Sequence, residues 1–583
     1  MDKVELEHIR HSLAHLLAAA VLKLYPNSKL AIGPAIDDGF YYDIEISEKI
    51  SDADLPKIET EMRKMLKTWD KFERQEVTAK EAKELFKDNP FKKELIDELE
   101  KNGEKITLYT SGPATAGFTD LCRGGHVESA KKINPDSFKL SRIAGAYWRG
   151  NEKNPQLTRI YGYAFSTKKE LNEYLTILEE AKKRDHKKLG PELDLFVFSD
   201  LVGSGLPLWT PKGTLVRNIL DDFVWELRKK CGYVQVDIPH ITKKDLYERS
   251  GHWDKFQDEL FKIITREGHL FAVKPMNCPH HTQIYARKPH SYRELPQRYA
   301  NTTKDYRDEQ TGELSGLSRL RAFTQDDAHV FCRMHQTKEE FLKIWDIVHE
   351  FYKAFGFELQ VRLSTHDPAH MEKYLGEEKK WDEAEKMLKE IVKEKKVDVI
   401  DGLGEAAFYG PKLDFLAKDS LGRDWQVATI QLDMNMPERF DLTCINEKGE
   451  KERIIMIHAA IMGSIERFLS IIIEHYAGAF PIWLSPVQAV VLTITEKQNK
   501  WAESVLENLK DSNIRADANL SNETLGKKIR EAEKQKIPYI LIIGDKEVKA
   551  KAVAVRQRGK GDTGQMKVKA LIENVKEEII SKK

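Results

Sequence analysis

Arg307 and Glu309 stand two residues apart before a loop, and their side chains suit the binding of a charged ligand. Gly312 and Gly316 interrupt the strand pattern and indicate a loop, and the flanking segments alternate apolar and polar residues. Together these features predict a strand–loop–strand hairpin over 301–333. Such an arginine points a planar set of donors at an anion, and such a glutamate accepts a hydrogen bond from an amine. For these residues alone, a solvated ion pair on a surface hairpin is the commoner explanation.

Two further pairs of residues, each four apart, carry nitrogen or sulfur donors. His11 and His15 share one face of a helix predicted over 8–25, and Cys122 and His126 flank a Gly-Gly turn. Two such pairs suffice in principle for a tetrahedral metal site. Two polar helix positions are the commoner explanation of a lone HxxxH, and the pattern lacks the glutamate of the HExxH zinc proteases.

Three segments together resemble the signature regions of class II aminoacyl-tRNA synthetases, and more narrowly those of threonyl-tRNA synthetases. They are KPMNCPHH at 274–281, FTQDDAHVF at 323–331 and GSIERF at 463–468. The resemblance runs from His11 into the C-terminal domain. It leaves out the small N-terminal ubiquitin-like domain of that family, for which we expect no counterpart because the HSLAHLLAA segment already begins at residue 11.

The resemblance implies that Cys278, His329 and His458 bind one Zn²⁺. Spacing does not suggest this, because the three residues lie 51 and 129 positions apart, and each alone is commonly a core or hydrogen-bonded residue. Two positions depart from the family. His280 stands where many relatives have glycine, and we expect it to point away from the metal. Ala459 replaces an arginine of many relatives, which puts any RNA or acidic contact at that position in doubt.

A metal suits threonine for a physical reason. Threonine and valine have nearly the same shape, and an apolar pocket discriminates a hydroxyl from a methyl by only about 100-fold. A metal with three protein ligands has open positions that the amine and hydroxyl of threonine fill together, whereas valine offers only the amine. Serine also fits, since one missing methyl is worth only about 1–3 kcal/mol, so a second, hydrolytic site is needed.

By the same resemblance, the amino-acid pocket surrounds the metal. Asp327 would accept a hydrogen bond from the substrate hydroxyl, and Tyr409 would contact the amino group. Gln325 and Lys412 lie in matching segments that line the pocket. L-Threonine is therefore the expected amino acid.

ATP, with Mg²⁺, is expected beside this pocket. The resemblance implies that Arg307 holds the substrate carboxylate and the α-phosphate, Glu309 the adenine amine, and Arg467 the γ-phosphate. No Walker A or GxGxxG sequence occurs, so an arginine–glutamate scheme must bind ATP. Arginines and Mg²⁺ spread the charge that develops at phosphorus, and the reaction needs no base of unusual pKa.

The early donor pairs also match the family. The resemblance implies an editing site that hydrolyses mischarged Ser-tRNA with a positioned water and no required metal. Gly125 stands where the family commonly has proline, which loosens the turn but removes no functional group. The implied editing residues are His11, His15, Lys92, Asp120, Cys122 and His126.

A chain of 583 residues is too long for one core and predicts several domains. We expect an N-terminal α+β editing domain at 1–166 and a charged linker helix at 167–190 that ends at Gly190-Pro191. A class II catalytic domain at 191–483, an antiparallel sheet flanked by helices, and an α/β anticodon-binding domain at 484–583 follow. The fold class is thus multidomain α+β and α/β.

The segment from Leu215 to Ile241 is a predicted helix that turns at Gly232 into a strand. Pro239 marks a strand boundary, because proline is tolerated in strands only at ends, edges or bulges. By itself this is equally well an ordinary helix–strand junction. It resembles class II motif 1, which implies a homodimer interface.

The last domain alternates strands and helices in a mostly parallel pattern and carries 20 lysines and arginines against 14 aspartates and glutamates. This positive surplus of six supports phosphate contacts, although simple solubility also explains it. The resemblance implies that Asn522, Glu547 and Arg556 read anticodon bases of tRNA(Thr).

Bulk composition narrows the class of protein. Formal net charge is zero, so any RNA-binding surface is local. Five scattered cysteines without a CxxC pair favour a reducing compartment, and no apolar run or signal-like segment predicts a membrane span, so we expect a cytoplasmic protein. Rival hypotheses are a class II synthetase of prolyl or seryl type, and a non-catalytic RNA-binding regulator descended from a synthetase.

Overall fold

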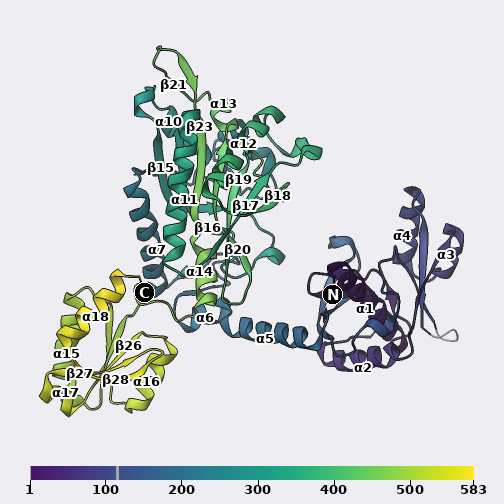
Figure 1. The fold of residues 1–583 in the computed structure, drawn as a ribbon, viewed down its shortest axis with the longest axis horizontal. Helices are drawn as coiled ribbons and strands as arrows, with labels where there is room; N and C mark the ends of the chain where they lie inside the picture. Colours follow the sequence, from purple (N-terminus) through teal and green to yellow (C-terminus); the bar gives the residue numbers. More distant parts are fainter. Residues whose placement is uncertain (1, 47, 113–116, 583) are drawn as a thin grey trace. The chain divides into compact units, whose positions relative to one another are not determined.

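The structure, a computed structural model, describes residues 2–46, 48–112 and 117–582. The chain divides into two compact units, residues 1–179 and 180–583. Colour follows the chain in Figure 1, from the purple N-terminal unit to the yellow C-terminal domain. Each unit has its own hydrophobic core, and each core supports one candidate site.

The first unit is built on α1 (Lys3–Leu24), whose apolar residues are buried against an antiparallel sheet. Leu13 and Leu17 recur at helical spacing and are fully buried in one cluster with Phe40. The helix ends at Leu24, as the following Pro26 predicts. The sheet runs in the order β1 (Lys29–Leu30), β3 (Gly39–Glu45), β8 (Gln156–Ala164) and β7 (Phe138–Tyr147), with β2 (Ala35–Ile36) paired to β3.

A second, three-stranded sheet of this unit delivers other polar residues to the same region. Asp120 lies in its last strand and Cys122 follows that strand directly. Lys92 lies in the first turn of α4 (Pro90–Lys101), which Asn89 caps by accepting hydrogen bonds from two backbone N–H groups. The strands are β4 (Phe72–Val77), β5 (Ile106–Ser111) and β6 (Phe118–Leu121); α2 (Leu55–Leu66) and α3 (Ala79–Leu85) complete the unit.

The linker is two helices, and the prediction of one helix ended by Gly190-Pro191 is wrong. The break comes at Asp185, between α5 (Lys168–Arg184) and α6 (His186–Glu192). Asp185 has non-helical backbone angles, and its side chain accepts a hydrogen bond from the backbone of Lys187, so it starts a new helix. Pro191 lies inside α6, which runs on to Glu192, so the Gly190-Pro191 pair does not end the helix.

The region predicted to be catalytic is, as expected, a sheet flanked by helices, and this sheet has eight strands. Its inner strand pairs are antiparallel, and only the outermost pair at each edge is parallel. The predicted hairpin is confirmed. The strand order is β11 (Val234–Gln235), β15 (Gln297–Tyr306), β16 (Ala322–Cys332), β23 (Ile455–Ser464), β20 (Asp424–Asp433), β19 (Lys412–Lys418), β17 (Leu359–Thr365) and β18 (Val399–Leu403).

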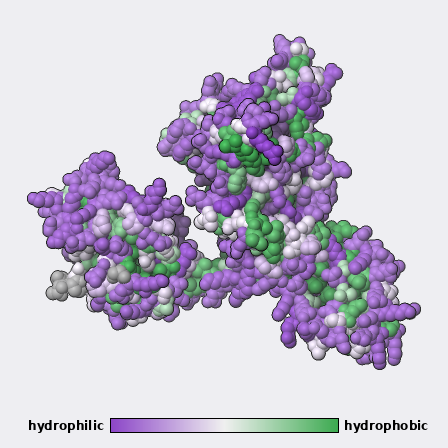
Figure 2. Space-filling view, turned by 180° about the vertical axis from the view of Figure 1, so that it is seen from behind, coloured by the Kyte–Doolittle hydropathy of each residue, from purple (hydrophilic) through white to green (hydrophobic). Residues whose placement is uncertain are grey.

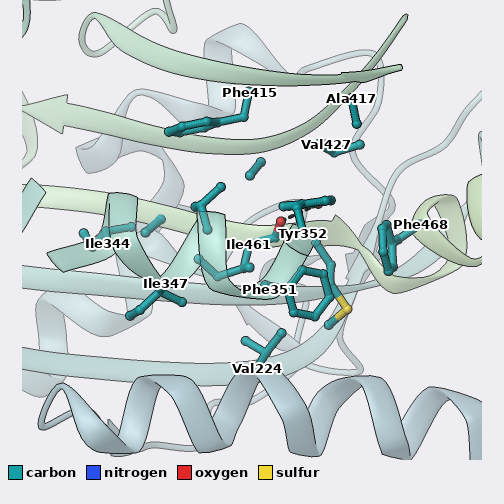
Figure 3. Close-up of a cluster of buried hydrophobic side chains, with 14 of the residues drawn as sticks. Val224, Ile344, Ile347, Phe351, Tyr352, Phe415, Ala417, Val427, Ile461 and Phe468 are labelled. Atoms are coloured by element: carbon teal, nitrogen blue, oxygen red, sulfur yellow. Dashed lines mark hydrogen bonds between the residues drawn. The ribbon is translucent and has the colours of Figure 1, made fainter. Parts of the chain in front are cut away.

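One face of this sheet carries the core. Ala328, Ala459, Ile430 and Leu413 pair in one row across four strands, and all four are buried in the largest hydrophobic cluster. Figure 3 shows helix side chains reaching this cluster, among them Phe351. The helices are α7 (Pro211–Lys230), α11 (Thr337–Lys353), α12 (Glu378–Lys395) and α14 (Ile465–His475).

Since successive residues of a strand point to opposite faces, the neighbours of these core residues lie on the other side of the sheet. The opposite face therefore carries the polar candidates.

The segment after α7 also behaves as predicted, because α7 ends before Gly232 and Pro239 lies beyond the short strand β11.

The C-terminal domain has a mixed sheet in the order β25 (Ala516–Asn519), β24 (Ala489–Thr493), β26 (Tyr539–Ile543), β27 (Ala552–Gln557) and β28 (Gly561–Lys567). The first three strands are parallel, and the last two add antiparallel pairs. The mostly parallel pattern predicted for this domain is therefore only half right, because β28 went unpredicted. Its helices are α15 (Asn499–Asp511), α16 (Leu525–Lys534), α17 (Asp545–Ala550) and α18 (Val568–Ile580).

The surface seen in Figure 2 is mostly hydrophilic, with hydrophobic residues in separate patches. Within the described part of the chain, no helix combines the length and apolarity needed to cross a bilayer.

Candidate functional site

A row of polar residues crosses four adjacent strands on the face of the large sheet opposite the hydrophobic core. Register pairs His329 with His458, His458 with Gln431, and Gln431 with Lys412. Side chains directly opposite each other on paired strands share a face and lie within contact distance. The sheet thus brings together residues that are far apart in the chain.

Cys278, His329 and His458 form one compact donor set, called here the sheet cluster. Their donor atoms all lie within 4.8 Å of one another, and His329 Nε2 is 3.0 Å from His458 Nδ1. Cys278 begins α10 (Cys278–Ala286), and all three residues are buried. One sulfur and two imidazole nitrogens leave part of the coordination sphere of an ion open, and zinc with three protein ligands can take four or five in all, so the set fits zinc of the catalytic kind.

Groups outside the sheet cluster fix its rings. Asp433 Oδ2 lies 2.9 Å from His458 Nε2, and His281 Nδ1 lies 2.7 Å from His329 Nδ1. Such outer partners hold a ligating imidazole in one tautomer and orientation, as metal-binding histidines require. His252 Nε2 approaches the Cys278 sulfur at 3.3 Å. Burial raises the pKa of the Cys278 thiol and lowers the pKa of His329.

The implied amino-acid residues differ in how close they lie to this cluster. Asp327 Oδ1 is 3.7 Å from His329 Nε2, and burial raises the pKa of the Asp327 carboxyl. The ring of Tyr409 stacks on His458 with centroids 4.7 Å apart, and its hydroxyl donates to Gln431. Lys412 shares the row, but its ammonium pairs with Asp414.

Gln325, predicted to line the amino-acid pocket, instead lines a cavity of about 530 Å³ together with the predicted nucleotide residues Arg307, Glu309 and Arg467. The guanidinium of Arg307 lies 5.3 Å from the centre of the Phe323 ring. Arg319 donates from Nε to Glu309 Oε2 at 2.8 Å. Arg467 sits in the first turn of α14, as predicted. This space, called here the Arg307 cavity, combines three arginines, one of which anchors a glutamate, with an aromatic face, which suits a nucleotide.

The first unit holds a second donor set, His11, His15, Cys122 and His126, called here the helix cluster. The Cys122 sulfur is 3.4 Å from His11 Nε2 and 3.3 Å from His126 Nε2. All four donors lie within 4.8 Å of one another, beside a cavity of about 520 Å³. Burial raises the pKa of Cys122 to about 11 and lowers the pKa of both His11 and His126. The geometry admits a metal ion or a water held by neutral side chains.

A buried ion pair adjoins the helix cluster. Lys92 Nζ lies 2.6 Å from Asp120 Oδ1, and both side chains are almost fully buried. Tyr42 donates to the other carboxylate oxygen, and His15 Nε2 is 4.0 Å from the same atom. Ser12 Oγ lies 3.1 Å from His126 Nδ1 and accepts a hydrogen bond from the backbone of Val127. All six predicted editing residues therefore meet.

The three departures from the family pattern have physical readings. Gly125 has φ of +84°, which proline cannot adopt, so the turn differs in backbone conformation and not only in stiffness. His280 is buried but is no member of the sheet cluster. Ala459 faces the helix-covered core, where Arg228 donates to its carbonyl oxygen at 3.3 Å.

The predicted anticodon residues reach the surface of the C-terminal domain from three elements. Asn522 is exposed in the loop before α16, and Glu547 lies in the first turn of α17. Arg556 lies on β27 and donates to Glu533 at 3.2 Å.

Several contacting residues had not been predicted. His281 lies one helical turn after Cys278, so its spacing gave a signal, and Tyr42 and Ser12 lie near predicted editing residues in space. Asp433 had no signal, because only strand pairing brings it to His458.

Comparisons with known proteins agree with the three regions. Residues 261–476 match the tRNA synthetase class II core domain of the G, H, P, S and T types. Residues 488–578 match an anticodon binding domain, and residues 106–161 match the threonyl and alanyl tRNA synthetase second additional domain.

Individual relatives cover almost the whole chain. A threonine–tRNA ligase of Porphyromonas gingivalis is 50% identical over 576 residues, which are 98% of this chain and 87% of that one. A threonine–tRNA ligase of Acetivibrio thermocellus is 48% identical over 98% of this chain and 88% of its own length. The crystal structure of the RNA binding domain of threonyl-tRNA synthetase from Cryptosporidium parvum matches with a TM-score of 0.64 and 37% identity, over 67% of this chain and 98% of that one.

Proposed function

The chain belongs to the threonyl-tRNA synthetases, the threonine–tRNA ligases of class II, and we propose that its two Cys/His clusters divide the work of such an enzyme. It is an ATP-dependent ligase with a class II core, an anticodon-binding domain and an editing-type domain. The sheet cluster selects L-threonine, and the helix cluster removes serine from mischarged tRNA(Thr).

Threonine is activated in and beside the Arg307 cavity. A carboxylate oxygen of threonine attacks the α-phosphorus of ATP, the bond from that phosphorus to the bridging oxygen breaks, and pyrophosphate leaves. Arg307 holds the carboxylate and the α-phosphate, and Arg467 holds the γ-phosphate, while Mg²⁺ accompanies ATP. Glu309, anchored by Arg319, accepts from the adenine amine. The 3′-terminal hydroxyl of the tRNA then attacks the carbonyl carbon of the adenylate, and AMP leaves.

The residues of the sheet cluster would hold Zn²⁺, and the outer partners of their rings support this assignment. When bound, the ion supplies open coordination positions that an amine and a hydroxyl fill together. Asp327 accepts a hydrogen bond from the substrate hydroxyl, and Tyr409 contacts the amino group. Gln325 lines the adjoining Arg307 cavity, and Lys412 supports the amino-acid pocket through Asp414.

The helix cluster hydrolyses the ester of Ser-tRNA(Thr). A water oxygen adds to the ester carbonyl carbon, the bond to the tRNA oxygen breaks, and that oxygen leaves with a proton, which gives free serine and free tRNA. Burial lowers the pKa of His11 and of His126, so both imidazoles are neutral at pH 7 and a ring nitrogen can accept a hydrogen bond from the water and orient it. The Cys122 thiol stays protonated, because its pKa is raised to about 11, and it therefore positions the water and does not attack.

The remaining assignments concern partners and location. We propose that Asn522, Glu547 and Arg556 read the anticodon of tRNA(Thr), that the α7 segment forms a homodimer interface, and that the enzyme works in the cytoplasm. Arg556→Ala should weaken charging of tRNA without changing threonine-dependent pyrophosphate exchange. An equal loss in both assays would contradict an anticodon role.

The observation that carries the proposal is the position of the sheet cluster beside the Arg307 cavity, which puts a ligand set suited to zinc next to a pocket suited to a nucleotide. Zinc analysis combined with amino-acid-dependent ATP–pyrophosphate exchange tests it. We expect one zinc per chain and exchange that depends on threonine. Exchange that depends on proline or serine would indicate another class II type. Absence of exchange with every amino acid tested would indicate that the chain is not an active synthetase.

A further inference from the structure

His186, the first residue of α6, is buried and hydrogen-bonded at both ring nitrogens. Its Nδ1 lies 2.6 Å from Glu474 Oε1, and its Nε2 accepts from the backbone N–H of Leu317 at 3.0 Å. An acceptor at Nε2 requires that Nδ1 carry the proton, so the imidazole is neutral and its tautomer is fixed by its partners. Although Asp185, His186 and Glu474 bring donor atoms together, this ring has no lone pair left for a metal.

The partner of Nε2 belongs to the loop between Arg307 and Arg321. Gly316, next to Leu317, has φ of +51°, and a Cβ there would lie 2.3 Å from His186 Nε2. The loop backbone thus presses directly on the imidazole. Leu317 is almost fully buried, so its N–H would have no water to replace this acceptor.

The same loop forms one wall of the Arg307 cavity. Leu317 and Arg319 both line it, and Arg319 anchors Glu309, the proposed adenine contact. Ser318 lies 3.1 Å from Ser470 of α14, the helix that carries Arg467. Displacing the loop would therefore move the adenine end of the pocket while leaving the sheet cluster in place.

We propose that His186 is a positioning residue for ATP: by accepting the Leu317 N–H, the linker helix α6 sets the loop that receives the adenine. His186 itself does not touch ATP. The inference rests on the proposed nucleotide site in the Arg307 cavity, and it adds to the ATP scheme a residue outside the three class II signature segments.

Elsewhere in the chain, His366 and Glu385 form a histidine–glutamate pair like that of His186 and Glu474, but without a hydrogen bond at Nε2 from any described residue. His366 Nδ1 lies 2.6 Å from Glu385 Oε1, and the His366 backbone N–H donates to the same oxygen at 2.9 Å. Its Nε2, however, finds no hydrogen-bond partner among the described residues. His366 lies outside the Arg307 cavity. The two pairs therefore separate the stabilising His–Glu contact from the loop contact.

Two substitutions of His186 each remove one of the two hydrogen bonds of its ring. His186→Asn keeps an amide donor near the Nδ1 position, for Glu474, but loses the acceptor for Leu317. His186→Gln places an amide oxygen near the Nε2 position and keeps that acceptor, but loses the ring donor to Glu474. In threonine-dependent pyrophosphate exchange we expect His186→Asn to raise KM for ATP about tenfold and His186→Gln to change it less than about twofold. KM for threonine should stay constant in both.

A merely structural role makes a different prediction. Loss of folded protein lowers the apparent kcat of both variants and leaves KM unchanged. Equal changes of KM for ATP in the two variants, or none, would overturn the proposal. The pair His366→Asn and His366→Gln is the matched control and should leave KM for ATP at its original value.

Gly316→Ala reaches the same contact from the loop, with His186 intact, and decides the question if His186→Asn does not fold. It should raise KM for ATP with KM for threonine unchanged; an unchanged KM for ATP contradicts the proposal. Arg467→Ala separates this inference from the proposed function, because it should abolish exchange outright if the Arg307 cavity binds ATP.

Discussion

The sheet cluster and the helix cluster place the same types of side chain in different surroundings. Both join one buried cysteine to histidines, and both hold their donors within 4.8 Å. They differ in what contacts the far nitrogens of the rings. In the sheet cluster, His458 has a carboxylate partner and His329 has an imidazole partner. In the helix cluster, His126 Nδ1 contacts the hydroxyl of Ser12, and His15 Nδ1 has no hydrogen-bond partner among the described residues. The carboxylate nearest to His15, that of Asp120, lies 4.0 Å from Nε2, beyond hydrogen-bond distance.

This difference supports the proposal that the sheet cluster binds a metal and the helix cluster hydrolyses an ester. A carboxylate behind an imidazole raises its basicity and favours the form that binds a cation. A hydroxyl orients a ring without adding charge, so it leaves a neutral imidazole that can exchange protons with water. Residue types and spacing look alike in the two clusters, and only the surrounding contacts tell them apart.

The largest expected effect comes from removing the sulfur of each cluster in turn. Cys278→Ser should release zinc and lower threonine activation by more than about 100-fold, since even outer partners of zinc ligands are worth about 10–100-fold. Metal analysis and pyrophosphate exchange measure this. The matched variant Cys122→Ser should retain one zinc per chain and full activation. Unchanged activation in Cys278→Ser would remove the metal from amino-acid selection.

A complementary loss is expected from the helix cluster. His11→Ala combined with Cys122→Ala should leave activation intact and slow hydrolysis of Ser-tRNA(Thr) by about 100-fold or more, because general acid–base groups contribute about that much. Release of serine from mischarged tRNA is the measurement. Continued clearance of Ser-tRNA(Thr) would place editing elsewhere, and loss of a second zinc would show that this cluster is also a metal site.

The outer carboxylates sharpen the contrast. Asp433→Asn should weaken zinc binding about 10–100-fold, because the His458 ring loses its charged partner. Competition with a chelator measures the affinity. Asp120→Asn, the corresponding change beside the helix cluster, should leave zinc binding unchanged. If both variants bind zinc as tightly as the unmodified chain, the outer shell does not distinguish the clusters.

The smallest effect is expected at Ser12. Ser12→Ala removes one hydrogen bond to the His126 ring, worth about 1 kcal/mol, and should slow hydrolysis about fivefold with zinc content unchanged. Ser28→Ala, another buried serine of the same unit, serves as the control. A much larger loss for Ser12→Ala would mean that the hydroxyl contacts the substrate itself.

Local patterns were sufficient to predict the elements that carry chemistry. The helix with His11 and His15, the Arg307 hairpin and the helix with Arg467 all follow from periodicity and turn residues. The prediction of a single linker helix was wrong because Asp185 caps a second helix, and this cap outweighed the Gly-Pro signal. The C-terminal sheet came out half right because β28 contains two glycines and several polar residues and reads as a loop.

The arrangement of the sites was less predictable than their elements. Cys278, His329 and His458 were assigned by resemblance, since they lie 51 and 129 residues apart: strand pairing brings His329 to His458, and Cys278 comes from the start of α10. Asp433 could not have been found from sequence, because its contact with His458 depends on that same pairing. Long-range register is a property of the folded sheet and leaves no trace in local spacing.

The pairing of β16 with β23 has one more consequence. Both histidines of the sheet cluster face the same side only because His329 lies opposite His458. A slip of a single position during assembly would send one imidazole into the apolar core and abolish the ligand set. If the cluster binds zinc as proposed, capture of the ion reports that these two strands have aligned correctly, and a misaligned chain would be recognisable by its failure to retain metal.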